Sequence, residues 1–110
     1  MSETVAIILT FRPEESDRFE QLFQAEVFPL WQEFKAQGKI IAASLTSVVD
    51  GSDRELKAGI RDYILHVHVP SRAEHTQFYT DARFLQFLEK VKPMQPEQPM
   101  VWLGNTLFQI

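Results

Sequence analysis

The sequence feature that most constrains the fold is a pair of short segments that are apolar on both sides. Residues 4–11 read TVAIILTF and residues 39–49 read KIIAASLTSVV, so both are rich in the β-branched and apolar side chains that favour strands. Successive side chains of a strand point to opposite faces of a sheet. Ala6 therefore faces away from Val5 and Ile7, and both faces carry apolar side chains that need cover.

A long amphipathic helix is predicted directly after the first of these strands. Pro13 suits a first helical turn, and the glutamates that follow it interact favourably with the positive end of the helix dipole. Because the apolar stripe keeps its phase across Pro29, we expect one helix with a kink near Glu26 and a C-cap at Gly38. The stripe, which recurs every three or four residues, consists of Phe19, Leu22, Phe23, Val27, Leu30 and Phe34.

The remaining elements follow the same alternation of strand and helix patterns. The polar residues 52–59 are predicted to be a loop, and residues 61–69 (RDYILHVHV) are predicted to form the third strand. Residues 71–74 form a capping box that predicts a short helix, and Asp81 is a candidate N-cap for a further helix. Residues 100–109 are predicted to form the last strand.

This order, βαββαβ, predicts an α+β ferredoxin-like fold, in which helices cover one face of a four-stranded antiparallel sheet. The length of 110 residues and the absence of a linker-like stretch indicate a single domain over residues 1–110. The chain has no residues left for a second layer, so a second copy must cover the open face. We therefore expect a homodimer, a dimeric α/β barrel with an enclosed pocket.

Charge and composition narrow the classes of partner. Eleven basic and fifteen acidic residues give a net charge of −4, which argues against a nucleic-acid-binding protein. The absence of cysteine excludes thiolate chemistry and fits a reducing compartment. The N-terminal residues lack the basic region of a signal peptide, and the apolar runs are too short for a membrane helix. We expect a cytoplasmic protein that binds neither nucleic acid nor membrane.

The third predicted strand carries side chains that could perform chemistry. Its period of two places Tyr63 and Leu65 on the helix side and His66 and His68 on the opposite side. The polar residues on neighbouring strands that would share the histidine face are Thr10, Ser44 and Thr46. This face would form the lining of an apolar pocket that contains a few polar groups, as ligand sites usually do.

His66 and His68 could have one of three roles. An imidazole can act as a general base near neutral pH. The His-x-His pair could also ligate a transition metal if His75 or Glu74 supplied a third ligand. The third role is structural, because pocket and interface histidines often have no chemical function. The residues alone leave these alternatives open.

Other side chains are candidates for contact with a small apolar or aromatic ligand. Trp31 and Trp102 are most simply explained as core or interface residues, and Arg83, like Arg61, could hold an anion at a pocket mouth. A buried amide such as Asn105 would need a partner if it pointed inward. The candidate ligand-binding residues are Thr10, Ser44, Thr46, Trp102, Asn105 and Arg61. No phosphate-binding loop or nucleophile elbow is present, so no nucleotide cofactor is expected.

Residues 63–93, YILHVHVPSRAEHTQFYTDARFLQFLEKVKP, resemble the antibiotic-biosynthesis monooxygenase branch of the dimeric α/β barrel superfamily. The likeness lies in a strand that begins with Tyr63, a short helix that bears His75, and a following helix with an F-x-x-F motif from Phe84. The long first helix before the second strand also fits. The family commonly has Trp at the end of the third strand, where this chain has Val69 and Pro70.

The resemblance implies a homodimer that oxidises an electron-rich aromatic, such as a hydroquinone or an anthrone, with O₂ and without flavin, metal or other cofactor. His75 matches the helical histidine of the family, so the candidate catalytic residues are His66, His68 and His75. Two other functions share this fold: a non-catalytic ligand-binding or stress-related barrel, and an isomerase of the muconolactone type.

Overall fold

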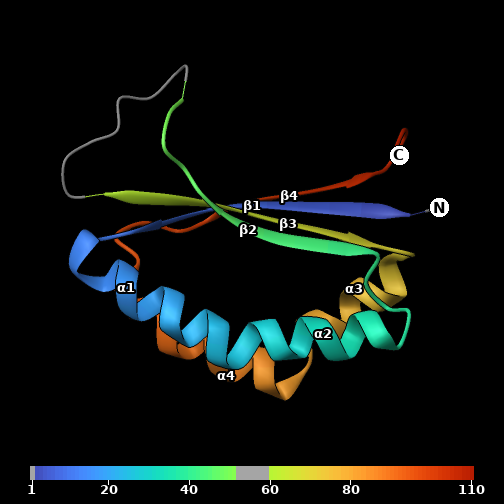
Figure 1. Ribbon diagram of the computed structural model, residues 1–110, viewed down its shortest axis with the longest axis horizontal. Helices are drawn as coiled ribbons and strands as arrows, with labels where there is room; N and C mark the ends of the chain where they lie inside the picture. The colour runs from blue at the N-terminus through green and yellow to red at the C-terminus, as the bar shows by residue number, and fades with distance from the viewer. Residues whose placement is uncertain (1, 52–59) are drawn as a thin grey trace.

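One face of the sheet carries every helix of the described residues (Figure 1). The structure is a computed structural model that describes residues 2–51 and 60–110. The sheet has four antiparallel strands in the order β2-β3-β1-β4, which confirms the predicted α+β ferredoxin-like fold. The loop predicted for residues 52–59 lies outside the described residues. No helix in the described part of the chain is long and apolar enough to cross a membrane.

The predicted elements are all present, with shorter second and last strands. The strands are β1 (Glu3–Phe11), β2 (Ala42–Ser47), β3 (Arg61–Val69) and β4 (Met100–Asn105). The helices are α1 (Pro13–Leu22), η1 (Phe23–Val27), α2 (Phe28–Ala36), α3 (Arg72–Tyr79), α4 (Ala82–Val91) and η2 (Lys92–Met94). β4 ends where its partner ends, because Asn105 pairs with Glu3 at the beginning of β1. β2 starts late because the N–H of Lys39 still bonds to the carbonyl of Phe34 in the preceding helix.

The irregularity expected near Glu26 takes the form of a π-helix, η1, between α1 and α2. The N–H of Phe28 donates to the carbonyl of Phe23, five residues back, instead of the usual four. This wider turn accommodates Pro29, which has no N–H to donate. The helix then ends at Gly38, whose φ of 75° is the left-handed conformation that a C-cap glycine adopts.

The start of α4 matches its predicted cap, but the start of α3 differs in detail. The Asp81 carboxylate accepts a hydrogen bond of 2.8 Å from the backbone N–H of Arg83. α3 begins after Ser71, as predicted, but the Ser71 half of the capping box does not form. The Ser71 hydroxyl donates to the Glu74 carboxylate and is not bonded to a backbone N–H of the helix.

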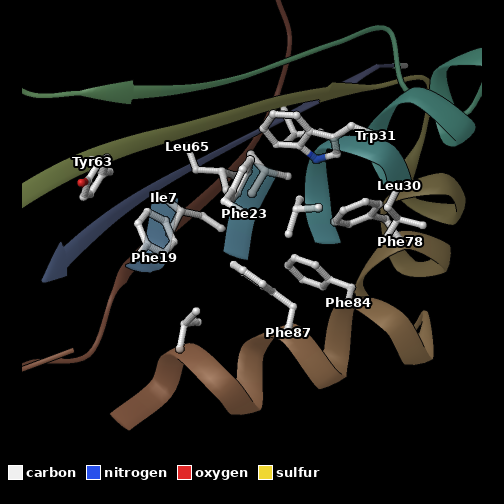
Figure 2. Packing of buried hydrophobic residues seen from close by; sticks show 14 of the residues in the cluster. Ile7, Phe19, Phe23, Leu30, Trp31, Tyr63, Leu65, Phe78, Phe84 and Phe87 are labelled. Atoms are coloured by element: carbon white, nitrogen blue, oxygen red, sulfur yellow. The ribbon is translucent and has the colours of Figure 1, made fainter. Parts of the chain in front are cut away.

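Aromatic side chains from the helices fill the space beneath the sheet. Phe19 is fully buried and stacks on Phe11 of β1, with 4.0 Å between ring centroids. Figure 2 shows Phe87 pointing from α4 toward Phe23, and these rings meet edge to face at 5.8 Å. Members of the predicted helical stripe that are buried here are Phe19, Phe23, Val27, Leu30 and Phe34. The stripe therefore docks the long helix onto β1 and β3.

The opposite face of the sheet is not covered by any element of the described residues. The strand register places Ser44, His66, Ala6 and Trp102 in one row across this face. Trp102 is 66% exposed, and the neighbouring Met100 is 53% exposed. We call this surface the open face.

Replacing Phe19 with Ala should lower the free energy of unfolding by about 3 to 5 kcal/mol, because it leaves a cavity among packed rings. Equilibrium urea unfolding measures this change. Leu85→Ala on α4 is the matched control, since Leu85 is 46% exposed, and it should change stability by about 0.5 kcal/mol or less. Equal effects of the two substitutions would contradict the described core.

Candidate functional site

A groove of about 530 Å³ runs between the long helix and the edge strand β2. Its aromatic wall is formed by Phe23, Phe28 and Trp31. The remaining lining residues are Glu20, Gln24, Ala43, Ser44, Leu45, Ser47 and Tyr63. Apolar walls with a few polar groups are typical of sites for small organic molecules.

The local sequence explains why this space is left open. The helix-facing positions of β2 include Ala43 and Ser47, whose side chains are too small to reach the long helix. On the helix, Glu20, Gln24 and Phe28 follow one another at intervals of four, so they lie on one side, next to the buried stripe. Large helical residues above small strand residues leave a groove at the edge of the sheet.

One end of the groove, beside Ser47 at the end of β2, holds a hydrogen-bonded tyrosine and glutamate. The Tyr63 hydroxyl donates to Glu20 Oε2 over 2.5 Å. Tyr63 is only 2% exposed, and this burial, reinforced by the adjacent carboxylate, raises the pKa of Tyr63 well above its ordinary value. Tyr63 therefore stays protonated and keeps donating to Glu20. The second carboxylate oxygen of Glu20 can accept a hydrogen bond from a bound molecule.

The predicted open-face residues do share one face. The register pairs Ala42 with His68, Ser44 with His66, and Thr46 with Ile64, and it also pairs Thr10 with Asp62. His66 is exposed, whereas His68 is buried and its Nε2 atom has no hydrogen-bond partner among the described residues. Thr10 donates to Asp62 Oδ1 over 2.9 Å. Of the predicted site residues, Ser44 also lines the groove.

Asn105, Arg61 and His75 lie elsewhere. Asn105 pairs with Glu3 and Arg61 with Phe11, so both occupy helix-side positions of the sheet and both are exposed. His75 lies on α3, on the helix side (Figure 1). The structure therefore does not bring the three histidines together. Arg83 is engaged in ion pairs with Glu33 and Asp81 on the surface.

The described residues contain no group of three or more His, Cys, Asp or Glu side chains that could hold a metal ion. Glu74, the carboxylate considered as a third ligand, is bonded to Ser71. A metal ion bound by His66 and His68 would therefore find no third ligand among the described residues.

His75 is partly buried, and its ring lies against Tyr79 with 4.5 Å between centroids. Burial lowers the pKa of His75, and the nearby Glu3 carboxylate opposes this shift only in part. The imidazole is therefore harder to protonate in the folded protein than in the unfolded chain. The fold therefore favours the neutral form of His75.

The lowered pKa of His75 should make stability fall as the pH drops below about 6.5, the ordinary value for histidine. In this range the unfolded chain binds the proton more readily, which favours unfolding. His75→Phe should flatten the slope of unfolding free energy against pH between about pH 7 and 5, whereas the neighbouring Thr76→Ala should keep it. Urea unfolding at several pH values tests this, and an unchanged slope in His75→Phe would contradict it.

Sequence reasoning missed most of the groove. Trp31 was interpreted as a core or interface residue, and Tyr63 as a core residue; both are buried, but both also line the groove. A second helical stripe could have indicated the groove. It consists of Glu20, Gln24, Phe28 and Trp31, at spacings of four, four and three residues. It runs beside the buried stripe and mixes polar with aromatic side chains, as a pocket wall does.

Solved structures share this architecture over nearly the whole chain. The protein Rv0793 from Mycobacterium tuberculosis is 16% identical with a TM-score of 0.77, covering 99% of this chain and 98% of that one. SnoaB, a cofactor-independent oxygenase from Streptomyces nogalater, is 12% identical with a TM-score of 0.68, covering 99% and 96%. Both proteins share the fold of this chain, and so does an antibiotic biosynthesis monooxygenase of known structure.

A protein from Nitrosomonas europaea, assigned provisionally as an antibiotic biosynthesis monooxygenase, is 8% identical with a TM-score of 0.77, covering 97% of this chain and 91% of that one. Comparison with family models and with curated proteins gives no match. At these identities the monooxygenase-like fold is established, whereas the reaction has to be argued from the residues of this chain.

Proposed function

We propose that this protein binds an uncharged, electron-rich aromatic molecule in the groove and oxidises it with O₂, without flavin or metal. The observation that carries the proposal is an aromatic groove that ends at the hydrogen-bonded pair of Tyr63 and Glu20. The fold shared with a cofactor-independent oxygenase supports the reaction class. The rings of Phe23, Phe28 and Trp31 would stack on the substrate.

In the proposed reaction, Glu20 is the general base. Its carboxylate takes a proton from an acidic C–H or O–H of the substrate, while Tyr63 holds the other oxygen in place. The substrate anion passes one electron to O₂, and the resulting radical pair combines into a peroxide anion. Protonated Glu20 then returns its proton to give the hydroperoxide. Loss of water then leaves a carbonyl, so that one oxygen atom enters the product and the other leaves as water. The apolar walls would shelter the radical pair from solvent.

The proposal predicts that Glu20→Gln lowers kcat for the oxidation of anthrone by at least about 10²-fold, since general base catalysis contributes 10² to 10⁴. Oxygen consumption and mass analysis of the ketone formed under ¹⁸O₂ measure the reaction. Glu14→Gln is the matched control, because Glu14 is an exposed residue of the same helix that does not line the groove. Its rate should equal that of wild type.

Two outcomes would overturn this assignment. Equal rates in Glu20→Gln and wild type would exclude Glu20 as the base. A loss of turnover in His66→Phe or His68→Phe, with Glu20→Gln unaffected, would move the chemistry to the open face, where the histidines remain predicted candidates. Binding of anthrone with no oxygen uptake in wild type would instead favour the non-catalytic ligand-binding alternative.

We also propose that a second copy of the chain covers the open face. This proposal is supported by the exposure of Ile64, Met100 and Trp102, which form an apolar surface on a sheet that has helices on its other side only. Packing two such sheets together buries apolar area on both copies and needs no further segment of the chain. The groove lies beside the edge strand β2. It would stay accessible in the dimer only if the second copy did not cover that edge of the sheet.

Trp102→Glu should convert the proposed homodimer to monomer, because it would place a charge in the apolar interface. Sedimentation velocity at about 10 μM protein measures the mass. Leu85→Glu, an exposed apolar position on α4, is the matched control and should leave the dimer intact. A monomeric wild-type protein at this concentration would contradict the proposal.

A further inference from the structure

The π-helix η1 leaves the backbone carbonyl of Gln24 without a helical hydrogen-bond donor. In an α-helix this carbonyl would accept from the N–H of Phe28, but that N–H donates to Phe23. In a π-helix it would accept from residue 29, which is a proline and has no N–H. Neither kind of helical partner is therefore available to the Gln24 carbonyl.

The free carbonyl belongs to the wall of the groove. In a helix the carbonyl of a residue points along the axis toward the residue four positions later, so it lies between those two side chains. For Gln24 these are its own side chain and that of Phe28, and both line the groove. Gln24 is exposed and Phe28 is 48% exposed, so this part of the helix surface is accessible.

A carbonyl in this position has a defined chemical preference. It accepts hydrogen bonds and cannot donate them, and an acceptor that loses water without gaining a partner is costly. A bound molecule that carries a hydroxyl or N–H at this point compensates the loss, whereas its methyl ether does not.

We propose that the Gln24 carbonyl determines specificity, in that it positions a hydroxyl group of the aromatic ligand in the groove. Pro29 is then a functional residue as well as a structural one, because it keeps this acceptor free. The inference rests on the proposed function for the location of the ligand and does not depend on whether the ligand is oxidised.

The direct test is carbonyl ¹³C NMR of the wild-type protein without oxygen, with 1,4-dihydroxynaphthalene and 1,4-dimethoxynaphthalene as probes. The Gln24 carbonyl, observed through the amide of Ala25, should shift downfield with the diol and not with the diether. The Phe23 carbonyl is the internal control, since it already accepts from Phe28, and it should move little. Equal shifts of the Gln24 carbonyl with both probes would overturn the proposal.

A variant tests the same point through affinity. Wild type should bind the diol about fivefold more tightly than the diether, the effect of one hydrogen bond. Pro29→Ala supplies an N–H, so the Gln24 carbonyl gains a partner in either helical form, and the preference should fall to about twofold or less. Pro13→Ala, at the start of α1 and outside the groove lining, should keep the fivefold preference.

The outcomes separate this inference from the oxidation chemistry. A preference for the diol that Pro29→Ala removes, without oxygen uptake in wild type, supports the carbonyl site and rejects the oxygenase function. Oxidation of anthrone with an unchanged preference in folded Pro29→Ala rejects the carbonyl site alone. If Pro29→Ala does not fold, the carbonyl shifts in wild type decide the question. Failure of both probes to bind rejects the site.

Discussion

Everything in this structure depends on the packing of one helical layer against one face of the sheet. The buried aromatic stripe of the long helix, with Phe19 and Phe23 at its centre, fixes how that helix is rotated over β1 and β3. The same rotation determines where the next stripe faces. Glu20 and Gln24 come directly after these phenylalanines in sequence, so they point toward the edge strand β2. The core thus positions the groove.

The groove also depends on a mismatch between the helix and β2. Short side chains at Ala43 and Ser47 leave the edge of the sheet thin, while Phe28 and Trp31 project over it. The π-helix lies in this wall, and together with Pro29 it has two effects. It keeps the helix continuous, so the buried stripe stays in phase, and it removes a donor from the backbone beside the groove. π-Helical turns are often found at functional sites, and this one lies in the same groove wall as Glu20, which accepts a hydrogen bond from Tyr63.

Much of the fold could be predicted from the residues because local patterns and tertiary packing agree. The period of two in RDYILHVHV placed Tyr63, Leu65 and Val67 in the core and His66 on the opposite face, as the structure has them. The strand ends were less predictable, because they depend on where a neighbouring strand ends, as β4 does beside Glu3. At Ser71 the hydroxyl donates to the Glu74 carboxylate and accepts no backbone N–H of the helix, an arrangement that the capping-box pattern does not predict.

The site was harder to predict than the fold. Histidines are obvious candidates because imidazole has versatile chemistry. However, His66 and His68 lie on the open face, whereas His75 lies on α3, on the other side of the sheet. The groove instead consists of residue types that are ordinary in a core or on a helix surface. What makes the groove a candidate site is the hydrogen bond between Tyr63 and Glu20, two residues that are 43 positions apart in the sequence. A contact of that separation is a property of the folded chain and leaves no local pattern.

The central claim is that small aromatic molecules bind in the groove and not on the open face. Amide chemical-shift mapping of the wild-type protein, titrated with 1,4-dihydroxynaphthalene under nitrogen, tests this claim most directly. We expect the largest shifts at groove positions that lie off the open face, namely Gln24, Phe28, Ala43 and Ser47. Shifts concentrated instead at Thr4, Ala6, His68 and Trp102 would place the ligand on the open face and contradict the claim.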